Sequence, residues 1–310
     1  MEDADSEDVK LCIVKNGSNE AAIKLYEECK KNSKFSKVFL ADLSKFIARI
    51  EKEKILISYK EGELDYNIYF LRTDPEEFPF NYLIASVLEK NGCVVIPSSN
   101  AILNCSNKCL IAKMLHDFNF EQPTTYFSFS PETAKRIAAN FEKVVLKFSK
   151  HGGKGTTILE NKSNVSEFID IFGEIAKPYC LQEFVEGEVI KNLVIADLVF
   201  SIKEYPKDGE NRSNIAKKRE LIKLSQQTNE NLISISDKMQ AYCCEIDLIE
   251  SNKKYYVIDI SLNPNLEMYA KITGTNIYKI LATYLSELAI KRKKMEHPII
   301  RLIETIFPIK

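Results

Sequence analysis

VVLKFSKHGGKGTTIL, residues 144–159, is the most informative segment of this chain of 310 residues. Alternate apolar residues predict one buried face of a strand, with Lys147 on the opposite face. A turn rich in glycine follows, and it contains Gly152, Gly153 and Gly155. Residues 156–159 predict a returning strand. Such a hairpin can bring backbone amides and a neighbouring lysine against phosphate oxygens, although a plain glycine hairpin explains the pattern equally well.

The composition is that of an ordinary globular chain, with 45% hydrophobic residues, 28% charged residues and a net charge of −1. This charge creates no positive field for nucleic acid. No apolar run approaches the about 20 residues of a membrane span, and the acidic residues 1–8 predict a flexible tail, not a signal peptide. The eight cysteines include no CxxC pair. We therefore expect a cytoplasmic protein with no nucleic-acid partner and no membrane partner.

The first hundred residues alternate between strand and helix patterns. Strands are predicted at 9–14, 37–40, 55–58, 68–71 and 93–96, and helices at 19–31, 43–50 and 81–91. This alternation predicts an α/β domain with a parallel sheet and helices on both faces. Ligands of such sheets bind at the carboxyl ends of the strands. Arg72 follows one of these strands, so it is either a ligand-binding residue or an ordinary surface arginine.

The remaining chain mixes helices and strands in α+β fashion. Helices are predicted at 106–118, 131–140, 165–172, 232–242 and 272–285, strands at 179–185, 190–195 and 198–205, and a basic loop at 207–219. Ser106 is the expected cap of the first of these helices. Lys108 lies in its first turn, where the helix dipole disfavours a cation unless an anion is held nearby.

An acidic hairpin is predicted at 243–263. Pairing of Asp247 with Asp259 across the turn also pairs Glu245 with Ser261, so all four side chains share one face. Like charges directly opposite each other are destabilising unless a cation neutralises them, and such oxygen ligands suit Mg²⁺. The alternative is an acidic face exposed to solvent on an edge hairpin.

The order of these signals resembles the ATP-grasp superfamily, most closely the RimK-like ligases that add glutamate or a related amino acid to a carboxylate. The resemblance covers about residues 9–288 and implies an α/β pre-ATP-grasp domain with a parallel sheet, followed by a two-lobed α+β ATP-grasp fold. The implied division is a tail at 1–8, the pre-ATP-grasp domain at 9–100, a small lobe with the glycine flap at 101–186, and a large lobe with the metal hairpin and C-terminal helices at 187–310.

The resemblance also implies roles for individual residues. The residues implied to bind ATP are Lys108, Lys147, Gly152, Gly153, Gly155, Gln182, Glu183, Phe184 and Val185. Those implied to bind Mg²⁺ or Mn²⁺ are Asp247, Asp259 and Ser261. Arg212 and Asn214, of an Arg-Ser-Asn motif, are the implied catalytic residues, and Arg72 and Lys217 the implied substrate residues.

This chain departs from the family pattern at two places. The family usually has Glu and Asn where this chain has Asp259 and Ser261, and paired arginines where it has Glu204 and Tyr205. Glu245 is a candidate for the missing oxygen ligand of the metal.

The implied function is an ADP-forming carboxylate–amine ligase. ATP would phosphorylate a carboxylate, of a small molecule or of a protein C-terminus, and the amine of a glutamate-like amino acid would displace the phosphate. Two alternatives remain: a catalytically impaired ATP-binding module, and an ATP-grasp kinase of an anionic small molecule. A homo-oligomer is the usual state of such ligases.

Overall fold

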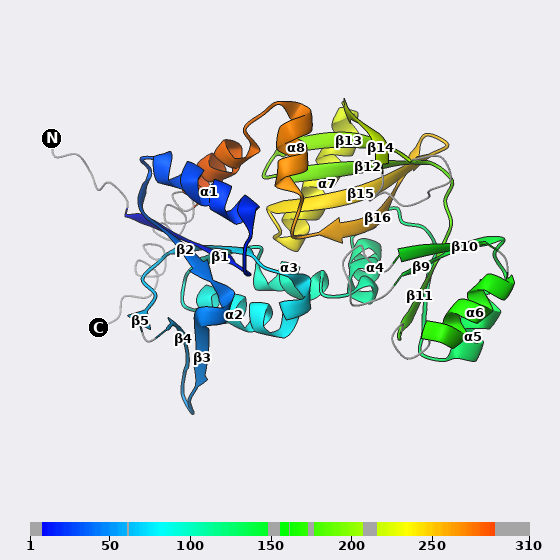
Figure 1. Ribbon diagram of the computed structural model, residues 1–310, viewed down its shortest axis with the longest axis horizontal. Coiled ribbons are helices and arrows are strands. Elements are labelled where there is room, and N and C mark those ends of the chain that lie inside the picture. Colours follow the sequence, from blue (N-terminus) through cyan, green and yellow to red (C-terminus); the bar gives the residue numbers. More distant parts are fainter. Residues whose placement is uncertain are drawn as a thin grey trace, which may run out of the picture. The chain divides into compact units, whose positions relative to one another are not determined.

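The computed structural model describes residues 8–60, 62–147, 156–160, 162–172, 177–206 and 216–288. They form two compact units (Figure 1). The first unit contains the described residues of Met1–Thr73, Phe80–Ser99 and Gly274–Lys310, and the second those of Asp74–Pro79 and Asn100–Thr273. In the described part of the chain, no helix has the length and apolar character needed to cross a membrane.

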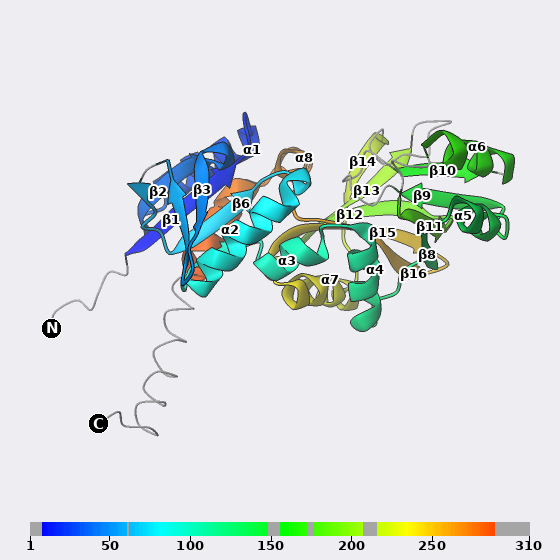
Figure 2. The same cartoon turned by 90° about the horizontal axis from the view of Figure 1, so that it is seen from below.

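The first unit is built on the expected parallel sheet. Its strands β1 (Val9–Lys15), β2 (Phe35–Asp42), β6 (Ile68–Arg72) and β7 (Val94–Ile96) lie in the order β2-β1-β6-β7. Helices α1 (Glu20–Lys31) and α2 (Phe78–Lys90) make the two crossovers. Helix α1 connects β1 to β2 on one side of the sheet, and α2 connects β6 to β7 on the other side. Because such connections are right-handed, α1 and α2 lie on opposite faces of the sheet (Figure 2).

Residues 43–50 do not form the predicted helix. A 3₁₀ turn at Leu43–Lys45 leads into strand β3 (Phe46–Ile50), which pairs with β4 (Ile55–Tyr59) and, through it, with the short β5 (Gly62–Glu63). The Asp42 side chain accepts hydrogen bonds from the backbone and hydroxyl of Ser44 and fixes the turn. The antiparallel partner strand thus overrides the helical spacing of the apolar residues.

A helix at residues 277–288 also belongs to the first unit. The Asn32 side chain, at the end of α1, donates to the carbonyl of Ala282 and lies 3.4 Å from the Ser286 hydroxyl. Leu281 and Leu285 on this helix are fully buried. We expected this helix within the large lobe at 187–310, whereas its buried face completes the core of the first unit.

The second unit begins with α3 (Ser99–Asn104) and α4 (Lys108–Asp117), followed by a small antiparallel sheet. This sheet has the order β10-β9-β11-β8 and consists of β8 (Thr125–Ser128), β9 (Lys143–Lys147), β10 (Thr156–Glu160) and β11 (Tyr179–Glu183). Helices α5 (Pro131–Ala138) and α6 (Lys162–Phe172) cover one face, where Val144 and Leu146 meet Ala134 and Ile169 in one core. Lys147 lies on the other face, as the alternation predicts.

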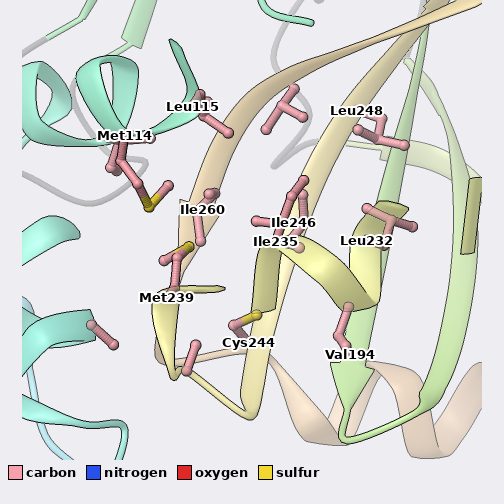
Figure 3. Close-up of a cluster of buried hydrophobic side chains, with 14 of the residues drawn as sticks. Met114, Leu115, Val194, Leu232, Ile235, Met239, Cys244, Ile246, Leu248 and Ile260 are labelled. Carbon is pink, nitrogen blue, oxygen red and sulfur yellow. The ribbon is translucent and has the colours of Figure 1, made fainter. Parts of the chain in front are cut away.

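A five-stranded antiparallel sheet forms the larger part of the second unit. Its order is β14-β13-β12-β15-β16, with β12 (Glu188–Ile195), β13 (Leu198–Pro206), β14 (Ala216–Ile222), β15 (Cys243–Ser251) and β16 (Lys254–Ser261). Helix α7 (Gln226–Met239) packs on one face, and Leu232 and Ile235 contact Val194 and Ile246 in a dry core (Figure 3). Helix α8 (Leu266–Thr273) contacts β13 and β14. The polar side chains gather on the face opposite α7.

The basic segment predicted as a loop at 207–219 is a strand in part, because its last residues begin β14. β14 is an edge strand that pairs only with β13 among the described strands. Charged side chains are common on edge strands, where one backbone side faces solvent. Residues 207–215 lie outside the described part of the chain.

Candidate active site

The β15–β16 hairpin has the predicted register. Asp247 is opposite Asp259, and Glu245 is opposite Ser261. A bulge follows between Asp247 and Leu248, because Leu248 pairs with Val257 and leaves Ile258 as an extra residue. The alternation then places the acidic side chains on the face opposite α7, while Leu248 and Val257 join the core. Lysines from three other elements approach this acidic face.

The first lysine is Lys108, the first residue of α4. Asn107, and not the expected Ser106, caps this helix, since its side chain accepts from the backbone amide of Leu110 at 3.0 Å. The Lys108 ammonium forms an ion pair with Oδ1 of Asp259. Burial raises the pKa of Asp259, but Lys108 and Lys147 lower it further, so the pKa lies below its usual value. An anionic carboxylate thus lies at the helix start, where a bare cation is disfavoured.

The second lysine is Lys147, at the end of β9. Its ammonium donates to the carbonyl of Ile258, the extra residue of the bulge, at 2.7 Å. The residue is 6% exposed, and burial lowers the pKa of its ammonium. Cys180 on β11 is directly opposite Lys147. The hydrogen bond therefore joins the small sheet to the bulge beside Asp259.

The third lysine, Lys191, was not predicted as a site residue. It lies on β12, opposite Asp247 on β15. Its ammonium is 2.9 Å from Asp247 Oδ2 and 3.2 Å from Glu245 Oε1. Burial lowers the pKa of Lys191, but the carboxylates of Asp247, Glu245 and Glu204 raise it further, so the lysine is charged. Burial holds the pKa of Asp247 above its usual value.

Several buried oxygens of this face have no hydrogen-bond partner among the described residues. They are Oδ1 of Asp247, Oε2 of Glu245, Oε2 of Glu204 and the hydroxyl of Tyr269. Buried carboxylate oxygens without a donor are costly, and a cation satisfies them. The donor set at Asp247 and Asp259 therefore fits a divalent cation. In the described part of the chain, no three acidic, histidine or cysteine residues form a ready metal cluster.

A neighbouring ion pair occupies the β13–β14 side of the face. Arg219 Nε donates to Glu204 Oε1 at 2.7 Å, and Glu204 is 2% exposed. These two residues are directly opposite each other in the sheet. Tyr269 of α8 is fully buried, and burial together with Glu245, Asp247 and Glu204 raises the pKa of its phenol. The polar face thus extends across all five strands.

The expected hinge follows the end of β11. Gln182 is buried, and its side-chain amide donates to the Thr125 hydroxyl at 2.9 Å. Glu183 makes two contacts with Thr124. The Glu183 backbone amide donates to the Thr124 carbonyl, and the Thr124 backbone amide lies 3.4 Å from Glu183 Oε2. Phe184 and Val185 follow in extended chain and are partly buried, and the Lys143 ammonium lies over the Phe184 ring.

The other expected site residues are not all described. Gly152, Gly153, Gly155, Arg212 and Asn214 lie outside the described residues. Lys217 is a residue of strand β14. Arg72 ends β6 in the first unit and is 6% exposed, so it is not an ordinary surface arginine. Ser261 ends β16, and its hydroxyl lies 3.3 Å from the Asn263 amide.

Comparison with known proteins assigns the family. The RimK-like ATP-grasp domain model matches residues 105–285. A Legionella pneumophila protein named "Probable alpha-L-glutamate ligase" is 27% identical over 211 residues, which cover 65% of this chain and 70% of that protein. A Vibrio cholerae protein of the same name is 23% identical over 291 residues, covering 91% of this chain and 96% of that protein.

Solved structures share the fold. The ATP-grasp ligase PsnB, complexed with a phosphomimetic variant of its minimal precursor, Mg and ADP, has a TM-score of 0.71 at 15% identity, covering 91% of this chain and 99% of its own. D-alanyl-alanine synthetase A from Vibrio cholerae has a TM-score of 0.67 at 12% identity, covering 93% of this chain and all of its own. With its parallel N-terminal sheet and the domain match over residues 105–285, this chain belongs to the RimK-like ATP-grasp family.

Proposed function

We propose that the protein is an ADP-forming ligase that joins a carboxylate to the amine of an amino acid. The observation that carries this proposal is the ion pair between Lys108 and Asp259, with the Lys147 ammonium bound one residue away at Ile258. Lys108 of α4, Lys147 of β9, and the carboxylates Asp247 of β15 and Asp259 of β16 provide the charges that a nucleoside triphosphate and a divalent cation require.

In this proposal, Lys108 and Lys147 bind the nucleotide phosphates. Their present partners, Asp259 and the Ile258 carbonyl, are acceptors that phosphate oxygens replace. Asp247 and Asp259 hold Mg²⁺ or Mn²⁺, which neutralises phosphate charge during phosphoryl transfer. The backbone and side chains of 182–185 contact the adenine, and the glycine turn with Gly152, Gly153 and Gly155 covers the phosphates.

Further residues are candidates for the acceptor side of the reaction. We propose that Arg72 binds the substrate carboxylate, because a buried guanidinium at the carboxyl end of a parallel strand suits an anion. Arg212 and Asn214 stabilise charge on the transferred phosphoryl group, and Lys217 binds the substrate. The amine then attacks the acyl phosphate carbon, a C–N bond forms, and phosphate leaves.

The names of the related proteins suggest the chemical class of the two substrates. Proteins named as probable alpha-L-glutamate ligases support a glutamate-like amino acid. Structures of ligases complexed with precursor peptides support a peptide carboxylate.

One observation favours a second candidate function, nucleotide binding without ligation. Asp259 is one methylene shorter than glutamate, and the Ser261 hydroxyl is a weaker ligand of Mg²⁺ than an amide carbonyl. This candidate predicts ADP and ATP binding without turnover. It also predicts that Ser261→Asn strengthens the dependence of nucleotide binding on Mg²⁺.

The deciding experiment measures ADP release with ATP, Mg²⁺ and a panel of carboxylates and amino acids. Mass spectrometry of the products identifies the bond formed. A ligase forms an amide and releases phosphate, whereas a kinase leaves the phosphate on its acceptor. Asp247→Asn should abolish the reaction. Nucleotide binding without ADP release across the whole panel would exclude the ligase.

A further inference from the structure

Lys191 and Glu245 form a charged pair on the polar face to which the proposed reaction gives no role. Lys191 lies on the central strand β12, and its side chain is 10% exposed. The ammonium contacts two carboxylates, Asp247 at 2.9 Å and Glu245 at 3.2 Å, whose side chains are 15% and 12% exposed. One buried cation is thus shared by two buried anions.

This sharing matters for any cation that binds Asp247. A lysine paired with a single carboxylate competes with a divalent cation for that carboxylate, because both are held by the same negative charge. Glu245 provides a second anion for the same ammonium. The pairing leaves Asp247 Oδ1 without a partner among the described residues, so this oxygen is available as a ligand.

We propose that Glu245 is a positioning residue that acts on the divalent-cation site through Lys191. Its carboxylate takes up the charge of the lysine, so that Asp247 remains available to the divalent cation. This inference rests on the proposed function, because it takes Asp247 as a metal ligand. It replaces the expectation that Glu245 is itself an oxygen ligand.

The surroundings of Glu245 support the indirect role. Its Oε1 contacts Lys191, and burial together with the charge of Glu245 raises the pKa of the fully buried Tyr269 phenol on α8. Its register partner is Ser261, not one of the two aspartates. Outer partners of this kind commonly control a metal site as strongly as its ligands do.

The test measures Mn²⁺ affinity by electron paramagnetic resonance, with saturating ADP and no turnover. Glu245→Gln leaves the lysine charge entirely on Asp247, so Mn²⁺ should bind about 10- to 100-fold more weakly. Adding Lys191→Met removes that charge, and the double variant should return to within about threefold of the wild type. If Glu245 is instead a direct ligand, the double variant binds Mn²⁺ as weakly as the single variant, and the inference is overturned.

Three further variants complete the test. Lys203→Met with Glu188→Gln removes an ion pair between β12 and its other neighbouring strand, β13, and it should leave Mn²⁺ affinity unchanged. If the methionine variant does not fold, Lys191→Gln with Glu245→Gln repeats the test with a neutral polar pair. Asp247→Asn separates the two proposals, since unchanged Mn²⁺ binding in this variant removes the metal site of the proposed function itself.

Discussion

The ion pair between Lys108 and Asp259 makes an unusual prediction for the nucleotide affinity of Asp259→Asn. Without metal, the Lys108 ammonium is paired with Asp259 and must leave it to bind a phosphate. The variant removes that competitor, so ADP should bind more tightly in EDTA. With Mg²⁺ the same substitution removes a metal ligand, so ADP should bind more weakly. The sign of the effect therefore depends on the metal.

The magnitude follows from the environment of the pair. The two side chains are 12% and 26% exposed, so the contact is partly buried. Unit charges about 4 Å apart attract by about 4 kcal/mol at an effective dielectric constant of about 20. Desolvation and side-chain entropy offset most of this attraction and leave about 1–2 kcal/mol. Metal-free ADP should therefore bind about 5- to 30-fold more tightly to the variant.

Isothermal titration with ADP, once in EDTA and once in excess Mg²⁺, measures both affinities. Asp117→Asn is the matched control, because Asp117 pairs with Lys113 on the exposed side of the same helix α4. It should change neither affinity. Weaker ADP binding of Asp259→Asn in EDTA would refute the reasoning, since it would mean that Asp259 helps Lys108 to bind phosphate.

Three other substitutions test single contacts. Lys147→Met should weaken ADP binding about tenfold or more with or without Mg²⁺, because a charged donor is lost; unchanged titration calorimetry would remove Lys147 from the site. In Gly187→Ala the new Cβ would lie 2.2 Å from the Glu250 carbonyl oxygen, so the free energy of unfolding should fall by about 2–3 kcal/mol in denaturant titrations. Asn19→Ala removes the cap bond to the Ala22 amide at 3.0 Å and should cost about 1 kcal/mol, seen as a lower Tm; an unchanged Tm would contradict the capping role.

The acidic hairpin was predictable because its pattern is local. Asp247 and Asp259 alternate with apolar residues on both sides of a short polar turn, and that alternation alone fixes which side chains share a face. Lys191 was missed, although the sequence contains a signal. A single lysine in the apolar strand sequence VIKNLVI requires a buried anion, and the nearest acidic strand supplies it.

Two errors of secondary structure have a common physical cause. Apolar residues at 43, 46, 47 and 50 have the spacing of a helical face, yet the last three belong to β3, because Ile55–Tyr59 offers an antiparallel partner. The basic residues 217–219 show no alternation of apolar residues, yet they belong to β14, which pairs with β13. Strand pairing is decided by residues distant in the sequence, whereas helical periodicity is local.

The bulge at Ile258 has a consequence for aligning this chain with its relatives. Ser251 and Lys254 close the hairpin around Asn252 and Lys253, both with positive φ, as in a type I′ turn. If the strand pairing continued from that turn without a bulge, Ile258 would lie opposite Asp247. The bulge shifts the register by one residue, so Asp259 lies opposite Asp247 instead. A chain shortened by Ile258 would keep the two aspartates opposite each other and lose the carbonyl that accepts from Lys147. In a relative with a regular hairpin, the one-residue gap therefore belongs between Val257 and Asp259, and not in the turn.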